Sequence, residues 1–487
     1  MNKLIFDNSE TIQSLAEAYD EYTEEEVIND SLEMFTSMKH IYIDSCKKLM
    51  FNILNNYESI VFTDDNILIY VHLAEYYNLN KKFTKYIVDE YILNRNKFYD
   101  ILWKHETINQ LILNKITNEN NISNETFEYL HNCNNMLFDR ATILTSEEIN
   151  DNNLKKFKYL NKLDVKNNKN ITDEGIQHMT QLKVLFIQGA DDITDKGIKH
   201  MIHLICLNMN NNKNITDEVI KHMTHLKQLG MSGNNNITDD GIKRMIHLTN
   251  LNMNNNKNIT NKGIKYMQLI ELCMDNNENI TNKGIKHMQL THLNASGYDC
   301  KISNDGIKHM QLIKLDCANN ENITDEGIKH MQLINLNCSN NENITNEGIK
   351  HMQLTHLNAS DDCKISDDGI KHMQLIKLNC GNNYNITDEG IKHMAQLTEL
   401  NASGNENITD DGIRHMTHLK VLYVGNDIIT NDGIINMTQL EFLCASYNPN
   451  ITNDGIQHMQ LNILRSFHNA NITHVGIAHM KNVKFYN

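Results

Sequence analysis

The sequence predicts an α/β solenoid made of short strand–helix units. The decisive observation is a nonapeptide, Ile-Thr-Asp-Glu-Gly-Ile-Gln-His-Met at residues 171–179, which occurs in fifteen related copies at steps of 21 or 22 residues. A repeat of this period is typical of proteins that stack one supersecondary unit on the next. The composition agrees, because a single Pro among 487 residues and a 40% hydrophobic content exclude collagen-like and proline-rich chains.

Residues 312–331 illustrate one unit, which begins with a strand. Leu315 and Cys317 alternate with Lys314 and Asp316, so a short strand directs the first pair into the core and the second pair outward. Asn320 follows where the chain turns off the strand, and its amide can hydrogen-bond backbone groups that the turn leaves unpaired. The first half of the unit therefore predicts an inward apolar column and a turn asparagine.

The second half of the unit predicts a helix of one or two turns. Thr324 is placed as its N-cap, and Asp325 lies in the first turn, where the helix dipole favours anions. Ile328 and Met331 share the buried face, and Gly327 lacks a Cβ, which lets neighbouring units approach closely. Since no unit can bury both faces alone, we expect stacked units with the bulkier helices outside and the strands on the concave side.

The pattern LxxLxLxxNxxITDxGI of this unit resembles the cysteine-containing subtype of leucine-rich repeats, which is found in F-box substrate adaptors of ubiquitin ligases. Asn320 stands where that subtype has a turn cysteine, and the period of 21 or 22 residues is shorter than the subtype's. The asparagine-rich, near-identical units are also similar to repeat proteins encoded by giant DNA viruses. The resemblance implies a leucine-rich-repeat horseshoe of about 15–17 units.

Three regions are expected along the chain. Residues 1–118 lack the repeat and are interpreted as a mostly helical N-terminal domain or cap, residues 119–170 as degenerate first repeats, and residues 171–487 as the solenoid. The segment 67–79, followed by Phe83 and Ile87, resembles a helix pair of BTB and Skp1-like domains. This resemblance implies that residues 1–118 contact cullin-type ubiquitin-ligase subunits. The alternative is a helical cap that covers the open end of the first unit.

Charge and composition argue against two classes of partner. The 61 Asp and Glu outnumber the 45 Lys and Arg, and the net charge of −16 leaves no surplus of cations for nucleic acid. No run approaches the length of an apolar membrane span, and residues 1–7 hold no apolar signal region, so we expect no membrane partner. Ten cysteines without a CxxC pair fit free thiols in a cytoplasmic protein, in the host cytoplasm if the protein is viral.

A histidine precedes the same methionine in twelve units. Equivalent positions in successive units lie too far apart to converge on one ion, so we expect no metal site and interpret the histidine as a partly buried helix residue copied by duplication. No phosphate-binding loop, dinucleotide motif or nucleophile elbow occurs, so we expect no cofactor and no enzymatic activity. The rival hypothesis is an enzyme that acts through thiols of the concave face. The twelve residues are His178, His200, His222, His287, His309, His330, His351, His372, His393, His415, His458 and His479.

The candidate binding site lies on the concave face of the last units, where the repeated pattern breaks. Middle units present small neutral side chains there, whereas the last units present aromatic residues and an arginine, which are enriched in interface hot spots. Exposed apolar patches of this kind often mark interaction sites. The alternative is degeneration of the terminal units, with atypical residues making capping contacts. The predicted partner-binding patch consists of Val421, Tyr423, Phe442, Cys444, Ile463, Arg465 and Phe467, with a smaller counterpart at Val184 and Phe186.

These observations favour a non-enzymatic protein–protein interaction scaffold that binds a partner on its concave face. A sharper hypothesis makes the protein a ubiquitin-ligase substrate adaptor, in which the solenoid holds a target while residues 1–118 recruit the ligase. The alternative is a structural or decoy repeat protein without a dedicated partner. The motif Cys-Lys-Ile-Ser at residues 300–303 recurs 63 residues later at 363–366, which indicates recent duplication of three units.

Overall fold

The computed structural model describes residues 124, 128, 138, 141–481 and 483–487. The chain divides into two compact units, residues 1–159 and residues 160–487. The predictions for residues 1–118 lie outside the described residues. In the first unit, strand β1 (Ile143–Thr145) and helix α10 (Asp151–Leu154) are described, and the rings of Phe138 and Phe157 pack 4.8 Å apart between their centroids.

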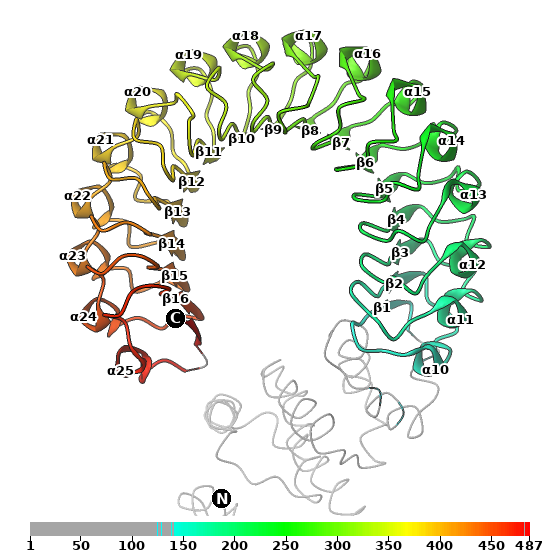
Figure 1. Ribbon diagram of the computed structural model, residues 1–487, viewed down its shortest axis with the longest axis horizontal. Helices are drawn as coiled ribbons and strands as arrows, with labels where there is room; N and C mark the ends of the chain where they lie inside the picture. Colours follow the sequence, from blue (N-terminus) through cyan, green and yellow to red (C-terminus); the bar gives the residue numbers. More distant parts are fainter. Residues whose placement is uncertain (1–123, 125–127, 129–137, 139–140, 482) are drawn as a thin grey trace, which may run out of the picture. The chain divides into compact units, whose positions relative to one another are not determined.

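Residues 160–487 form a curved solenoid with strands lining its inner side and short helices its outer side, as predicted (Figure 1). Sixteen described strands of this unit pair in parallel with their sequence neighbours, each in register with the next. They are β2 (Lys162–Asp164), β3 (Val184–Phe186), β4 (Cys206–Asn208), β5 (Gln228–Gly230), β6 (Asn250–Asn252), β7 (Glu271–Cys273), β8 (His292–Asn294), β9 (Lys314–Asp316), β10 (Asn335–Asn337), β11 (His356–Asn358), β12 (Lys377–Asn379), β13 (Glu399–Asn401), β14 (Val421–Tyr423), β15 (Phe442–Cys444), β16 (Ile463–Arg465) and β17 (Lys484–Tyr486).

Fifteen described helices of four residues each follow these strands on the outer side. Each begins after a Thr or Ser in extended conformation, which confirms the predicted N-cap position. They are α11 (Asp173–Ile176), α12 (Asp195–Ile198), α13 (Asp217–Ile220), α14 (Asp239–Ile242), α15 (Asn261–Ile264), α16 (Asn282–Ile285), α17 (Asn304–Ile307), α18 (Asp325–Ile328), α19 (Asn346–Ile349), α20 (Asp367–Ile370), α21 (Asp388–Ile391), α22 (Asp410–Ile413), α23 (Asn431–Ile434), α24 (Asn453–Ile456) and α25 (His474–Ile477).

The core lies between the sheet and the helices and is built from the same positions in every unit. In the unit of β9 and α18, Leu315 is 2% exposed, and Cys317, Ile328 and Met331 are fully buried. Burial of one such aliphatic side chain contributes about 1.5–3 kcal/mol. Each side chain stacks on its counterparts in adjacent units, so the core is continuous and no unit is stable alone.

A buried asparagine after each strand holds the turns of adjacent units together. The amide nitrogen of Asn320 donates to the carbonyl oxygens of Ala295 at 2.8 Å and Ile302 at 3.2 Å, both in the preceding unit. Its side-chain oxygen accepts from the backbone nitrogen of Asn322 at 3.1 Å. Asn320 is 1% exposed, so these bonds satisfy groups that water cannot reach, as the sequence predicted.

The first residue of each helix has a second role that links adjacent units. The carboxylate of Asp325 accepts from the backbone nitrogen of Thr345 at 2.8 Å and from its hydroxyl at 2.6 Å. A Cβ added to Gly348, in the next helix, would clash with that carboxylate. The glycine therefore permits the close approach predicted for it, and the aspartate in the first turn of α18 bonds the N-cap residue of α19.

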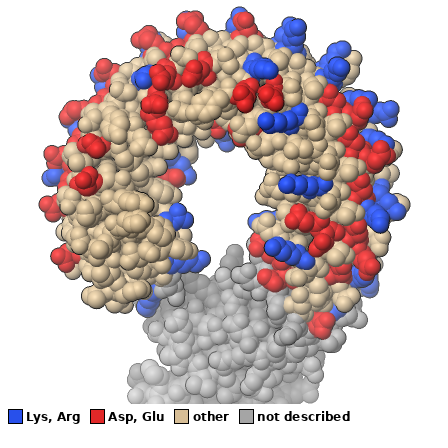
Figure 2. Space-filling view, in the orientation of Figure 1, with Lys and Arg blue, Asp and Glu red and all other residues tan. Residues whose placement is uncertain are grey.

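Surface charges follow the helices of the outer side. Lys and Glu three residues apart form ion pairs, as between Lys329 and Glu326 at 2.7 Å and between Lys392 and Glu389 at 2.6 Å. Figure 2 shows these charges over the first and middle units, with fewer charged side chains over the C-terminal units on this face. No helix among the described residues is long and apolar enough to span a membrane.

Candidate protein-binding face

Two columns of side chains cover the concave face, because the first and third residues of every strand point outward. In β9, Lys314 is exposed and Asp316 is half-buried, whereas Leu315 between them points into the core. Parallel in-register pairing aligns each outward residue with its counterparts, so Lys314 lies beside His292 and Asn335. The concave face therefore displays, strand by strand, the residues that vary most between units.

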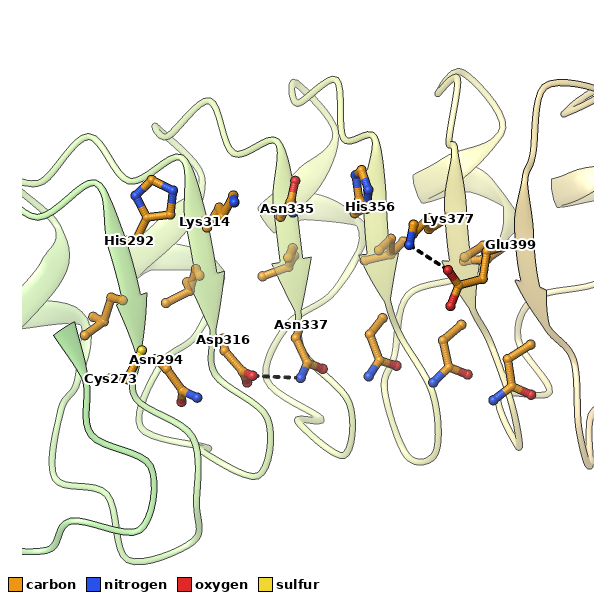
Figure 3. A pocket seen from close by; sticks show the side chains of 18 of the residues that line it. Cys273, His292, Asn294, Lys314, Asp316, Asn335, Asn337, His356, Lys377 and Glu399 are labelled. Carbon is orange, nitrogen blue, oxygen red and sulfur yellow. Dashed lines mark hydrogen bonds and ion pairs between the residues drawn. The ribbon is translucent and has the colours of Figure 1, made fainter. Parts of the chain in front are cut away.

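The middle strands line a shallow groove of about 810 Å³ (Figure 3). Its first column carries charges, and Lys377 forms an ion pair with Glu399 at 2.7 Å. In its second column, the amide of Asn337 donates to Asp316 at 3.0 Å. Burial raises the pKa of the Asp316 carboxyl, although this bond and the backbone nitrogen of Ala318 oppose the shift. Three carboxylates, of Glu271, Asp316 and Glu399, and two lysines, Lys314 and Lys377, line the groove, so charges of both signs lie along it.

The asparagines of the second column are largely engaged by their own turns. The side-chain oxygens of Asn294, Asn358 and Asn401 each accept from the backbone nitrogen two residues later, at 3.0 to 3.2 Å. Asn337 and Asn379 make the same bond to Ser339 and Gly381. The turn-forming bond gives a structural reason for the repetition of asparagine at this position.

The C-terminal strands bring most of the predicted patch together. The rings of Tyr423 and Phe442 lie 4.8 Å apart between centroids, at an interplanar angle of 40°. The guanidinium carbon of Arg465 lies 5.6 Å from the ring centroid of Phe442 and 5.9 Å from that of Tyr486. The arginine thus contacts two aromatic rings at once, a cation–π arrangement that restrains its side chain.

The remaining patch residues occupy the columns that were predicted for them. Val421, Phe442 and Ile463 are aligned in one column, and Tyr423, Cys444 and Arg465 in the other. Phe467, two residues beyond β16, is 43% exposed. The four residues Val421, Phe442, Ile463 and Cys444 are half-buried.

Two contributions to this surface were absent from the sequence prediction. Tyr486 of β17 extends the column of Arg465. The alternation Lys484-Phe485-Tyr486 in the last strand is the sequence pattern that could have predicted this position. Tyr447 stacks on His468 at 4.7 Å and 26°, and both residues have positive φ, near 60° and 56°. Both residues lie in turns, where the alternation of a strand does not predict the direction of a side chain.

Val184 and Phe186 lie on β3, eleven strands away from β14, and the structure does not join them to the C-terminal patch. The ammonium nitrogen of Lys162 lies 5.6 Å from the centroid of the Phe186 ring. Register places Val184 beside Cys206 and Phe186 beside Asn208. This pair is a small separate feature with only one aromatic ring.

The histidines lie just after the helices, and the structure corrects the expected partial burial. Ten of the twelve are exposed, and only His415 and His458 are half-buried. The difference arises because the helices are only four residues long, so the histidine falls in the following turn. No group of three or more potential ligands able to hold a metal ion occurs among the described residues.

Three cysteines lie on the strands of the concave face. Cys206, Cys273 and Cys444 are free and half-buried. Burial raises the pKa of the Cys206 and Cys273 thiols, which lowers the fraction of reactive thiolate at neutral pH. Cys317, Cys338 and Cys380, expected as small hydrophobic core residues, are fully buried.

Comparisons with known proteins give likenesses only to solved structures. No protein-family model and no curated protein sequence matches the chain. The chain is similar to the yeast structure of the Rad7 and Elc1 complex, with 14% identity and a TM-score of 0.46, covering 88% of this chain and 98% of that one. It is also similar to the TLR13–ssRNA13 complex, with 19% identity, a TM-score of 0.38, and coverage of 70% and 55%. A third similar structure is an internalin, inlF, from Listeria monocytogenes, with 17% identity, a TM-score of 0.27, and coverage of 77% and 96%.

Proposed function

We propose that the protein is a non-enzymatic scaffold that binds a protein partner on the concave face of strands β14 to β17. The observation that carries this proposal is Arg465, held between the rings of Phe442 and Tyr486. The guanidinium is exposed, and no described carboxylate forms an ion pair with it. Because its rotamers are already restricted by two rings, less entropy is lost when a ligand binds.

The chemistry of this patch favours a partner that presents a carboxylate beside apolar side chains. A guanidinium binds a carboxylate through two parallel hydrogen bonds. Tyr423, Phe442 and Ile463 supply half-buried apolar surface around it. Lys484 of β17 lies beside Ile463 and adds a second positive charge. An acidic residue flanked by apolar residues, or a chain terminus, fits this combination.

The test is affinity purification with the full chain and two patch variants. Replacement of Tyr423, Phe442 and Phe467 together by Ala should abolish partner capture, because it removes the aromatic surface without touching the buried Leu column. Arg465→Lys keeps the charge but loses the planar stacking and the double hydrogen bond, so capture should fall about tenfold or more.

The matched control replaces the outward Asn358 and Asn379 of the middle units by Ala, and capture should be retained. Circular dichroism should show that all variants are folded. Capture that is unchanged in the triple variant would refute the patch as the binding site.

We also propose a finer role, in which the scaffold is a cytoplasmic substrate adaptor and residues 1–118 recruit cullin-type ubiquitin-ligase subunits. Its support is the resemblance of segment 67–79 to a helix pair of BTB and Skp1-like domains. Tagged full-length protein should then co-purify with a cullin subunit. Absence of any cullin subunit, with the solenoid partner still captured, would remove the adaptor role and leave the scaffold.

Deletion of three units separates an adaptor from a passive repeat protein. Removal of residues 310–372 joins His309 to Met373 in the same repeat phase. An adaptor with a fixed distance between target and ligase should keep partner capture but lose ubiquitination of the partner. A structural or decoy protein should capture no specific partner, and the deletion should cause no loss of ubiquitination.

A further inference from the structure

Two buried cysteines from adjacent units lie side by side in the core. Cys338 directly follows β10, and Cys363 lies between β11 and α20. Their sulfur atoms are 3.5 Å apart, and the residues are 0% and 1% exposed. We infer that Cys338 and Cys363 form a redox-sensitive site, at which a peroxide converts the two thiols into a disulfide that links the unit of β10 to the unit of β11.

The backbone holds both sulfur atoms in place. The nitrogen of Cys338 donates to the carbonyl oxygen of Asn358 in β11 at 2.9 Å. Next to Cys363, Lys364 forms a parallel bridge with Thr345 of the preceding unit. A disulfide needs a sulfur–sulfur distance of about 2.05 Å, so the two side chains must approach by about 1.5 Å.

The surroundings of the two thiols assign them different roles. A hydrogen bond with the Cys338 thiol and the backbone N–H groups of Ile365 and Lys364 lower the pKa of Cys363. The same thiol–thiol hydrogen bond, together with burial, raises the pKa of Cys338. Burial opposes the shift at Cys363, but only this sulfur is faced by backbone N–H groups, so we assign Cys363 as the attacking thiolate and Cys338 as the resolving thiol.

The chemistry balances with hydrogen peroxide as the oxidant. The Cys363 thiolate attacks one peroxide oxygen, the O–O bond breaks, and the products are a sulfenic acid and hydroxide. The sulfur of Cys338 then attacks the Cys363 sulfur, its proton goes to the departing hydroxyl, and water leaves. The sum is two thiols and one peroxide giving one disulfide and two waters, with two electrons moved from sulfur to oxygen.

The chain contains its own control at Cys300, in the other copy of Cys-Lys-Ile-Ser. Cys300 is 1% exposed, and Lys301 forms the equivalent parallel bridge with Thr281. The position that corresponds to Cys338, directly after the preceding strand, is occupied by Met274. Burial raises the pKa of Cys300 to about 11. The two copies share the backbone arrangement and differ in the facing side chain, so Cys300 lacks the thiol that faces Cys363.

The test treats the folded full-length protein with hydrogen peroxide, alkylates the remaining thiols and digests it without reduction. Mass spectrometry should find the peptides of Cys338 and Cys363 joined, with the loss of two hydrogens, and a thiol reductant should separate them. Cys300 should be recovered alkylated. Cys363→Ala should eliminate the link, whereas Cys300→Ala should leave its yield unchanged.

A gain-of-function variant keeps the test independent of losses caused by misfolding. Met274→Cys places a thiol in front of Cys300 and should create a second peroxide-dependent link, between residues 274 and 300. The inference is overturned if folded wild-type protein shows no Cys338–Cys363 link. It is equally overturned if the link forms only after unfolding, or if Cys338 pairs instead with the neighbouring buried Cys317.

Discussion

The middle units, from β7 to β12, and the terminal units, from β14 to β17, share one buried framework but display different surfaces. In both regions a buried Leu occupies the centre of the strand, except in β17, where a half-buried Phe485 takes this position. An asparagine bonds the turns, as do Asn341 and Asn448. Outward positions differ, with Asn337 in the middle and Arg465 at the end. Packing constrains only the inward and turn positions, so specific recognition can develop on the outward ones without a cost to the fold.

Substitution of the buried asparagines should have the largest effect on the free energy of unfolding, and this effect should be similar in both regions. Asn341 donates to three backbone carbonyls, of Cys317, Asn320 and Ile323, at 2.7 to 3.3 Å. Asn341→Ala leaves these groups buried without a partner and should lower the free energy of unfolding by about 3 kcal/mol. Asn448→Ala should cost a similar amount, measured by urea unfolding followed by circular dichroism.

The control for this pair is Asn343→Ala, whose exposed amide makes one bond, to the carbonyl of Glu321 at 2.9 Å. Water can replace that bond, so its cost should stay below about 1 kcal/mol. If Asn448→Ala left the free energy of unfolding unchanged, the two regions would not share their framework.

Substitution of the helix glycines should have the second largest effect on stability. A Cβ at Gly369 in the middle, or at Gly455 near the end, would clash with the side-chain oxygen of Asn346 or Asn431. Gly369→Val and Gly455→Val should each lower the free energy of unfolding by about 1–3 kcal/mol, as overpacking does. In the unit with a natural valine, the bond from the nitrogen of Val219 to the oxygen of Thr216 is 3.4 Å long, against 2.8 to 3.2 Å for the equivalent bonds of the glycines.

Thermal and urea unfolding can both measure this glycine effect. Asp368→Ala, at the exposed residue preceding Gly369, is the matched control and should leave stability nearly unchanged. Equal stability of Gly369→Val and the wild type would contradict close packing of the helices.

The smallest effect should be a pH dependence of stability to which His415 and His458 contribute. Burial lowers the pKa of His415 and His458, assisted by the nearby His393 and His479, respectively. The Nε2 atoms of both rings are buried without a partner among the described residues. The unfolded state therefore binds protons more readily, and stability should fall as pH drops below the ordinary histidine pKa of about 6.5.

The loss between pH 7 and pH 5.5 should be below about 1 kcal/mol, because both rings are half-exposed. The double variant His415→Asn and His458→Asn should reduce that loss, since Asn436 occupies the same position in the unit of α23. Asn436→Gln, which adds no titratable group, is the control. A pH dependence that is identical in the double variant would contradict this origin.

Sequence reasoning succeeded where a role is played within one unit. The alternation around Leu315, the cap at Thr324 and the turn bonds of Asn320 follow from local rules, and the structure confirms them. It underestimated Asp325, which was assigned only to the dipole of its own helix. The aspartate also caps Thr345, twenty residues later, because stacking brings the next unit against it.

In the candidate site, too, some features could be predicted from the sequence and others could not. The two outward columns of the last strands follow from period-two alternation, so their members could be named in advance. The contact of Arg465 with Tyr486 could not be predicted from the sequence. The stacking of Tyr447 on His468 could not be predicted either. Side-chain rotamers and turn conformation decide these contacts, and a repeat pattern carries no information on either.

The sequence by itself determined the period, the parallel stacking and the direction of each side chain, because each unit must bury the same apolar positions against its neighbours. Only the tertiary structure decided which particular side chains meet across units. Cys363 faces Cys338, whereas Cys300 has Met274 at the corresponding position, although both cysteines stand in the same tetrapeptide. The physical reason is that a contact between units joins residues about 20–25 positions apart, and its chemistry depends on both partners rather than on either motif.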